Sequence, residues 1–306
     1  MRPEMAFLPS KIDGLRAYVY ACVLPPSRRG EGVRSKTAEN ASTVPVGRGD
    51  RRGNAHLLRP NCRFHESLCY ICSMVYRKLT PEEYADFASR ILYEDNHLLV
   101  VNKKSGEITQ GDKTGDECLA ESYKAFIAER DAKPGQVFLG IPHRLDRPVS
   151  GICVLAKTSK SLGRLGVIFK EGGAHKTYWA LCCAKPEPPE GHLEDWLIKN
   201  EPKNKSYVTT ERPGAKLAKL NYRLLGSTER YHLVEVELLT GRHHQIRCQL
   251  GNIGCPIKGD LKYGAPRSNP DGGINLHAHE IRFEHPVKHT EVHVIAPPPA
   301  SWPELK

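Results

Sequence analysis

The sequence predicts an α+β fold built on a largely antiparallel sheet. Segments with strand patterning outnumber those with helical patterning, and the two kinds do not alternate regularly along the chain. The 306 residues suffice for one large domain or two small ones, and a hydrophobic content of 39% supports a sizeable core. No apolar run is long enough for a transmembrane helix, so we expect no membrane partner.

Each expected element has its own local signal. Thr80 can cap a helix over 81–90, because a proline takes the first helical position and glutamates fill the first turn. Strand patterning covers 98–102, 152–157, 176–183, 233–239, 276–283 and 291–296. Helical patterning covers 118–131, 160–170 and a short segment at 245–253.

The first 73 residues differ from the rest. They hold 12 Lys and Arg against 6 Asp and Glu, and so carry +6 of the formal net charge of +10. Residues 25–60 are rich in Arg, Gly, Ser, Thr and Asn and show no periodicity, which indicates disorder. We therefore expect a low-complexity basic extension over 1–73, which can also be an upstream segment without function, and a folded domain over 74–306.

Histidine and cysteine gather near the end of this extension. Four possible metal ligands occur there: Cys62, His65, Cys69 and Cys72. Their spacing is tighter than in a usual zinc ribbon or finger, which favours scattered cysteines over a zinc site.

The compartment is predicted from cysteine usage and the amino terminus. Several of the ten cysteines, among them Cys153 and Cys182, lie in apolar strand-like runs, as reduced core residues do in intracellular proteins. The Arg-rich start is compatible with an organellar transit peptide, but Glu4 and Asp13 argue against one. We expect a cytoplasmic protein, with a mitochondrial or nuclear location left open, and a monomer.

The charge of the chain indicates a phosphate-rich partner. A net charge of +10 and a pI of about 9.1 are typical of proteins that bind nucleic acid. Residues 74–306 are only mildly basic, so any binding of nucleic acid by this part of the chain must come from a local patch.

One carboxylate stands out. Residues 143–151 read His-Arg-Leu-Asp-Arg-Pro-Val-Ser-Gly, and an apolar, β-prone run follows. Asp146 therefore lies in a loop that leads into a buried strand, between Arg144 and Arg147. Neighbouring positive charge favours the carboxylate form, which suits a nucleophile. The alternative is a surface loop with a local Arg–Asp pair.

Further motifs follow in a fixed order. Residues 241–247 read Gly-Arg-His-His-Gln-Ile-Arg, and 256–264 contain Pro-Ile-Lys-Gly-Asp and Tyr-Gly. Residues 93–103 end in Val-Val-Asn-Lys, and 176–181 read Lys-Thr-Tyr-Trp-Ala-Leu. With the His-Arg-Leu-Asp motif, they resemble the RluA-like RNA pseudouridine synthases over about residues 91–297. The resemblance implies the pseudouridine synthase fold, with a mixed, mostly antiparallel central sheet, flanking helices and an active-site cleft. It also implies isomerisation of uridine to pseudouridine in rRNA or tRNA, without cofactor or metal.

The resemblance also implies roles for particular residues. Asp146 is the catalytic acid, which adds to C6 of the base, attacks C1′ or assists a glycal intermediate. Arg242 pairs with this aspartate, and Tyr178 stacks on the flipped uracil and takes part in proton transfer. Arg144 fills the gap that the extruded base leaves. The candidates for phosphate contacts are Lys103, Arg247, Lys258 and Lys262.

Two positions depart from the family pattern. Lys104 replaces a proline and Val149 a threonine, which alters loop stiffness and one hydrogen bond. Because the Asp, Tyr and Arg positions are intact, we expect an active enzyme. The alternatives are a non-catalytic RNA-binding protein or RNA chaperone on the same fold, and a zinc-dependent module built on the N-terminal cysteines. The histidines of the later motifs, including His244, are expected to be structural.

Overall fold

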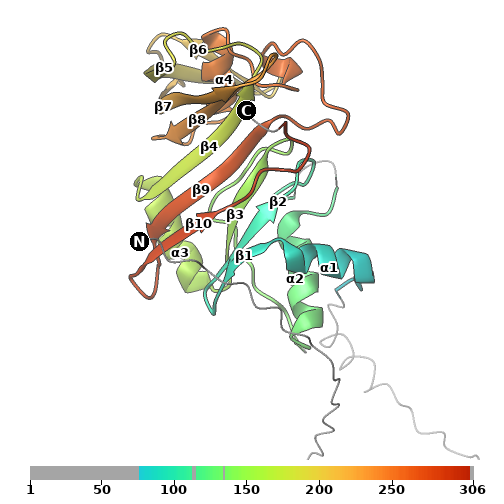
Figure 1. Cartoon of the computed structure of the whole chain (residues 1–306). Helices are drawn as coiled ribbons and strands as arrows, with labels where there is room; N and C mark the ends of the chain where they lie inside the picture. Colours follow the sequence, from blue (N-terminus) through green and yellow to red (C-terminus); the bar gives the residue numbers. More distant parts are fainter. Residues whose placement is uncertain (1–75, 112–114, 134, 304–306) are drawn as a thin grey trace, which may run out of the picture. The chain divides into compact units, whose positions relative to one another are not determined.

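The computed structural model describes residues 76–111, 115–133 and 135–303, which all belong to one compact unit (Figure 1). The predicted extension over 1–73 and its cysteine cluster lie outside the described residues.

The framework is one mixed sheet of ten strands. Its strands are β1 (Ile91–Glu94), β2 (Leu98–Lys103), β3 (Ser150–Ala156), β4 (Ala174–Cys182), β5 (Glu190–Asn200), β6 (Lys205–Thr209), β7 (Lys216–Ser227), β8 (His232–Leu238), β9 (Leu276–Glu284) and β10 (Glu291–Ile295). They follow the order β1-β2-β3-β9-β4-β8-β7-β5-β6, and β10 pairs with β9. Among the described strands only β3 and β9 pair in parallel, so the predicted α+β fold with a mostly antiparallel sheet is confirmed.

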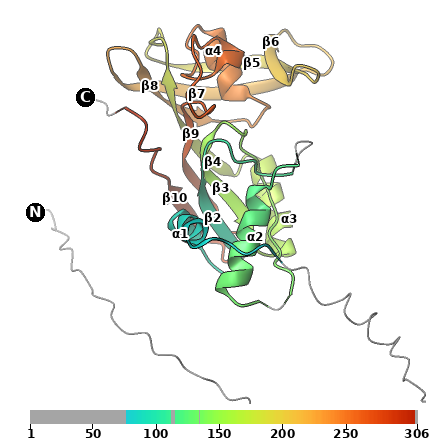
Figure 2. The same cartoon turned by 90° about the vertical axis from the view of Figure 1, so that its right-hand side faces the viewer.

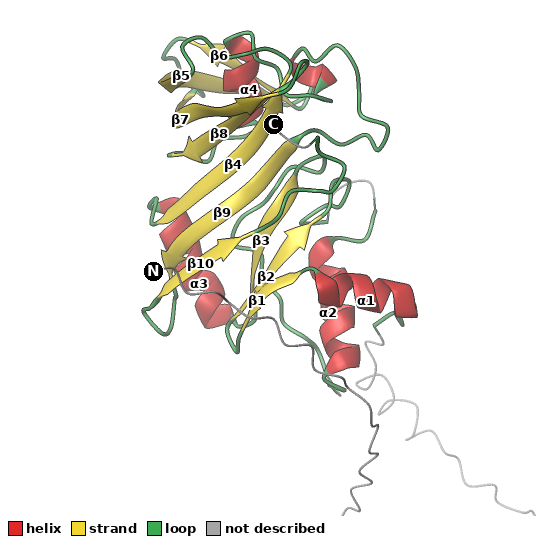
Figure 3. Cartoon of the chain, viewed as in Figure 1, coloured by secondary structure: helices red, strands yellow, loops and turns green. Residues whose placement is uncertain are grey.

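The helices are α1 (Pro81–Ser89), α2 (Leu119–Arg130), α3 (Ser159–Lys170) and α4 (Gln245–Asn252). α1, α2 and α3 lie with β1, β2 and β3, whereas α4 lies with β5, β6, β7 and β8 at the other end of the sheet (Figures 2 and 3). The predicted cap is confirmed, because Thr80 forms a capping box with Glu83 at the start of α1. None of the described helices is both long enough and apolar enough to cross a membrane.

Strand β3 is buried along its whole length, as its apolar sequence predicts. Val154 belongs to the core cluster that also holds Leu165 of α3. Leu155 belongs to a second cluster, which contains Phe126 of α2. Helices therefore cover both faces of β3, and the strand forms a rigid support for the loop that precedes it.

Gly151 sets how closely β3 approaches β9. Its φ is +111°, and a Cβ atom at this position would lie 2.4 Å from the carbonyl oxygen of Ala278. Only glycine fits such a contact without moving one of the strands. The hydroxyl of Ser150 adds a 2.9 Å hydrogen bond to Nδ1 of His277 in β9. These contacts fix the end of the loop that carries Asp146.

Strands β1, β5, β6 and β7 were not predicted. In β5 only Leu197 is buried, and charged side chains interrupt any alternation of apolar residues. In β7 the buried side chains alternate over Ala218, Leu220 and Tyr222, and the other face is not buried. Pairing with neighbouring strands, rather than a strong local pattern, holds these segments in the sheet.

Candidate active site

A cavity of about 430 Å³ opens between the loop before β3, the end of α3, strand β4 and the turn that begins α4. This volume lies within the range of small-ligand pockets, about 300–1,000 Å³. Among the described residues, Asp146 is the only carboxylate that lines the cavity. The cationic side chains that line it are Arg144, Lys170, Lys176, Arg242 and Arg247. The cavity thus combines one acid with a strongly positive wall, which favours a polyanionic ligand.

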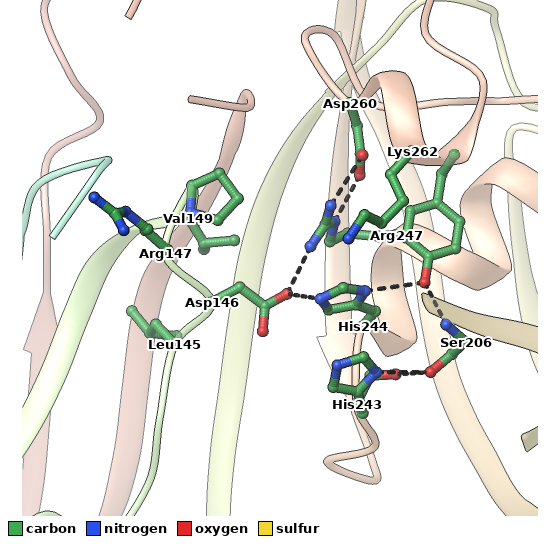
Figure 4. Close-up of polar contacts among 12 residues, drawn as sticks. Leu145, Asp146, Arg147, Val149, Ser206, His243, His244, Arg247, Asp260 and Lys262 are labelled. Carbon is green, nitrogen blue, oxygen red and sulfur yellow. Dashed lines mark hydrogen bonds and ion pairs between the residues drawn. The ribbon is translucent and has the colours of Figure 1, made fainter. Parts of the chain in front are cut away.

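Arg247 holds Asp146 from the first turn of α4 (Figure 4). Its Nη1 donates to Oδ2 of Asp146 at 3.0 Å, while Nε and Nη2 donate to the two oxygens of Asp260 at 2.6 and 3.0 Å. Asp260 is only 1% exposed, whereas the Asp146 side chain is 31% exposed. Burial would lower the pKa of Arg247, but the hydrogen bonds and charge of Asp260, with the charge of Asp146, raise it.

The partner of Asp146 differs from the one predicted. Arg242 is exposed, and its Nε donates to the carbonyl of Leu217 at 2.8 Å. Arg242 therefore lies at the wall of the cavity. Arg247, which was predicted to contact phosphate, is the arginine that pairs with Asp146. Both arginines belong to one sequence motif, and spacing along the chain does not tell which of them points at the loop.

Tyr178 lies in β4 and lines the same cavity, as expected of a residue that meets the base. It is 8% exposed, and no described residue hydrogen-bonds to its hydroxyl. Burial, with a further contribution from the charge of Asp146, raises the pKa of Tyr178 above its ordinary value. The hydroxyl is therefore protonated at neutral pH and free to donate a hydrogen bond.

His244 contacts the same oxygen of Asp146 as Arg247 does, a role that the sequence analysis missed. Its Nε2 lies 3.4 Å from Oδ2 of Asp146, and its Nδ1 lies 3.0 Å from the hydroxyl of Tyr263. Burial, together with the charge of Arg247, lowers the pKa of His244 to about 2, so the ring is neutral. Only the tertiary fold reveals this contact, because a histidine beside a helix start is a weak signal in sequence.

The predicted phosphate contacts divide into buried and exposed side chains. Lys258 donates to Asn269 and Asn275 and is half-buried. Lys262 is exposed and donates to the carbonyl of Asn204. Arg144 is exposed beside Asp146 and has no partner among the described side chains. Of these residues, Arg144 is the one best placed to meet a ligand in the cavity.

Lys103 cannot act as a surface phosphate contact, contrary to the prediction. It is 1% exposed, and its Nζ donates to the carbonyls of Lys104, Arg147 and Val149. Two of these carbonyls belong to the loop of Asp146, so Lys103 ties that loop to the end of β2. Burial lowers the pKa of Lys103 to about 8.

Exchange of Lys103 for methionine tests this burial. Between pH 8 and 10.5 the folded protein binds fewer protons at Lys103 than the unfolded chain does. The unfolding free energy of the wild type, relative to Lys103→Met, is therefore expected to rise across this interval by about 2–3 kcal/mol. Urea unfolding of both proteins over this pH range measures the difference. A difference that stays constant with pH would contradict the buried position of the amine.

Known proteins show the same fold and sequence pattern. A model of the RNA pseudouridylate synthase family matches residues 97–252. The ribosomal large subunit pseudouridine synthase C of Vibrio cholerae is 32% identical over 219 residues, which cover 70% of this chain and 67% of the relative. The mitochondrial pseudouridylate synthase RPUSD4 of Xenopus tropicalis is 29% identical over 242 residues, covering 66% of this chain and 74% of the relative.

A solved structure adds agreement in fold. The human RNA Pseudouridylate Synthase Domain Containing 4 matches with a TM-score of 0.60 at 24% identity, over 71% of this chain and 91% of that protein. The family match spans about half of the chain, and the Vibrio cholerae relative is matched over two thirds of its length. The chain therefore belongs to the RluA-like RNA pseudouridine synthases and is an isomerase that acts on RNA.

Proposed function

We propose that this enzyme converts specific uridines of ribosomal or transfer RNA to pseudouridine, with Asp146 as the catalytic nucleophile. One observation carries the proposal: Asp146 is the only acid among the described residues of a cavity with a cationic wall. The ribosomal large subunit enzymes among the relatives make the RNA of that subunit the first candidate substrate.

The chemistry is an isomerisation that balances within the nucleotide. The bond from C1′ to N1 breaks, the uracil turns in the cavity, and a bond from C1′ to C5 forms. The proton leaves C5 and N1 gains one, so no oxidant, reductant or co-substrate is consumed. Asp146 adds to C6, attacks C1′ or assists a glycal intermediate, and each route needs an ionised carboxylate in a site shielded from water.

The other lining residues have complementary roles. The Tyr178 ring is positioned to stack on the flipped uracil, and its protonated hydroxyl can donate a hydrogen bond as charge develops on the base. Lys170, Lys176 and Arg242 line the wall and bind the phosphates of the flanking nucleotides. The guanidinium of Arg144 enters the space that the extruded base leaves in the RNA.

Arg144→Met is expected to lower kcat/KM by about 10- to 100-fold, because a stacking contact with a base contributes about 1–3 kcal/mol. The thermal unfolding temperature should stay unchanged, since Arg144 is exposed and has no partner among the described side chains. Arg223→Met is the matched control, because Arg223 is an exposed arginine of β7 that pairs with Glu235 away from the cavity. Equal kcat/KM for the two variants would exclude the role given to Arg144.

Tritium release tests the proposed activity and substrate. Cellular RNA labelled at C5 of uridine is separated into large-subunit ribosomal, small-subunit ribosomal and transfer RNA, and each fraction is incubated with the wild-type enzyme. Release from the large-subunit fraction is expected. Release from transfer RNA alone would overturn the first candidate substrate but keep the chemistry. RNA binding without release from any fraction would favour the non-catalytic RNA-binding protein.

A further inference from the structure

The two oxygens of Asp146 have unequal surroundings. Oδ2 lies 3.0 Å from Nη1 of Arg247 and 3.4 Å from Nε2 of His244. Oδ1 contacts no polar group of the described residues, and Figure 4 shows it turned away from both donors. A carboxylate held through one oxygen leaves the other oxygen available to a ligand in the cavity.

The contacts of His244 select one tautomer of its ring. An unprotonated Nε2 would direct its lone pair at the negatively charged carboxylate of Asp146, and the two would repel each other. We therefore assign the ring proton to Nε2. Because the ring is neutral, Nδ1 is then an acceptor and takes the hydrogen of the Tyr263 hydroxyl at 3.0 Å. Arg247 on the same carboxylate adds to the burial that opposes a second proton on the ring.

Tyr263 is itself fixed as a donor toward His244. The backbone N–H of Ser206 in β6 donates to the Tyr263 oxygen at 2.8 Å, so the tyrosine hydrogen is left for the imidazole. Tyr263 is buried, and burial raises its pKa, so the hydroxyl keeps this hydrogen at neutral pH. Hydrogen bonds thus run from Ser206 through Tyr263 to His244, whose Nε2 lies 3.4 Å from Oδ2 of Asp146.

The backbone and a neighbouring ring fix the direction of the imidazole. His244 has a φ of +52°, a left-handed conformation that costs a non-glycine residue about 1 kcal/mol or more. His243 stacks on it with ring centroids 3.8 Å apart, and the hydroxyl of Ser206 holds His243. The strained backbone turns the His244 ring toward Asp146, immediately before α4 begins.

We propose that His244 is a positioning residue for Asp146. Tyr263 holds its ring in the Nε2–H tautomer, and His244 and Arg247 together hold Oδ2, so that Oδ1 is the oxygen presented to the uridine. This inference rests on the proposed function, because it assumes that Asp146 acts on the substrate.

Nitrogen-15 NMR of the wild-type protein labelled at histidine tests the tautomer directly. The two ring nitrogens of His244 are identified by the signals that disappear in His244→Gln. At neutral pH we expect a protonated Nε2 and an unprotonated Nδ1. Tyr263→Phe should shift these signals toward a mixture of tautomers, whereas Tyr222→Phe should leave them unchanged. Tyr222 is the matched control, since it is a buried tyrosine whose hydroxyl bonds to the carbonyl of Pro188.

Kinetics of two His244 variants test the positioning. His244→Leu is expected to lower kcat by about 10- to 100-fold at nearly unchanged KM, because a small misplacement of a reacting group has this effect. His244→Gln retains an N–H donor and should recover most of that loss. A wild-type His244 protonated on Nδ1, or His244→Leu with wild-type kcat, would overturn the proposal. If the wild type itself formed no pseudouridine, the proposed function would fail while the tautomer could still be measured.

Discussion

Asp146→Asn is expected to lower kcat by about 10⁴-fold or more, as the removal of a nucleophile does in other enzymes. Asparagine keeps the size of the side chain, but its amide has no ionised oxygen to act on the base. RNA affinity should change only a few-fold, because the cationic wall of the cavity is untouched. Single-turnover formation of pseudouridine, followed by chromatography of the released nucleosides, measures the effect.

The fold should survive this exchange, because Arg247 keeps its two hydrogen bonds to Asp260. Asp131→Asn is the matched control, since Asp131 is a carboxylate at the end of α2 that pairs with Arg130 and lies outside the cavity. Its kcat is expected to equal that of the wild type. Wild-type kcat in Asp146→Asn would move the chemistry away from this carboxylate.

Arg247→Met is expected to lower the unfolding free energy by about 3–5 kcal/mol and to abolish most of the activity. The loss arises because Asp260, at 1% exposure, would be left charged and buried without its cation. Asp146 would also lose one of the two groups that orient it. Urea unfolding gives the stability, and the tritium assay gives the activity.

A double variant separates these two effects. Replacing both members of a buried ion pair with apolar residues is often close to neutral for stability. Arg247→Met with Asp260→Leu should therefore recover part of the unfolding free energy but none of the kcat. Arg242→Met is the control for stability, since the guanidinium of this exposed arginine bonds, among the described residues, only to the backbone carbonyl of Leu217. A loss below about 1 kcal/mol in Arg247→Met would contradict the buried network.

The sequence predicted the elements whose signals are local. The apolar run of β3 indicated a strand buried on both faces, and Thr80 marked the start of α1, because each depends only on neighbouring residues. Strand β5 was missed because only Leu197 is buried and charged residues interrupt its pattern. Strand β7 was missed although its buried side chains alternate, because only three of its twelve residues are buried. Their place in the sheet depends on partners distant in sequence, which no local window contains.

In the candidate site, too, local motifs pointed to some residues, whereas the roles of others depend on tertiary contacts. Asp146 and Tyr178 line one cavity, and their catalytic roles stay predictions. The prediction that Arg242 pairs with Asp146 was wrong, because the conformation of the turn before α4 directs Arg247, and not Arg242, toward the loop of Asp146. Lys103 resembled a surface cation, but backbone carbonyls from the Asp146 loop bury its amine. Tertiary contacts, and not residue type, determine which arginine pairs with Asp146 and whether Lys103 is buried.

Tritium release by three proteins in parallel tests the central claim most directly. Wild type, Asp146→Asn and Asp131→Asn are incubated at equal concentration with unfractionated cellular RNA labelled at C5 of uridine. The proposed role of Asp146 predicts equal release by wild type and Asp131→Asn, and none above background by Asp146→Asn. Release by Asp146→Asn at the wild-type rate would show that this carboxylate is not the nucleophile.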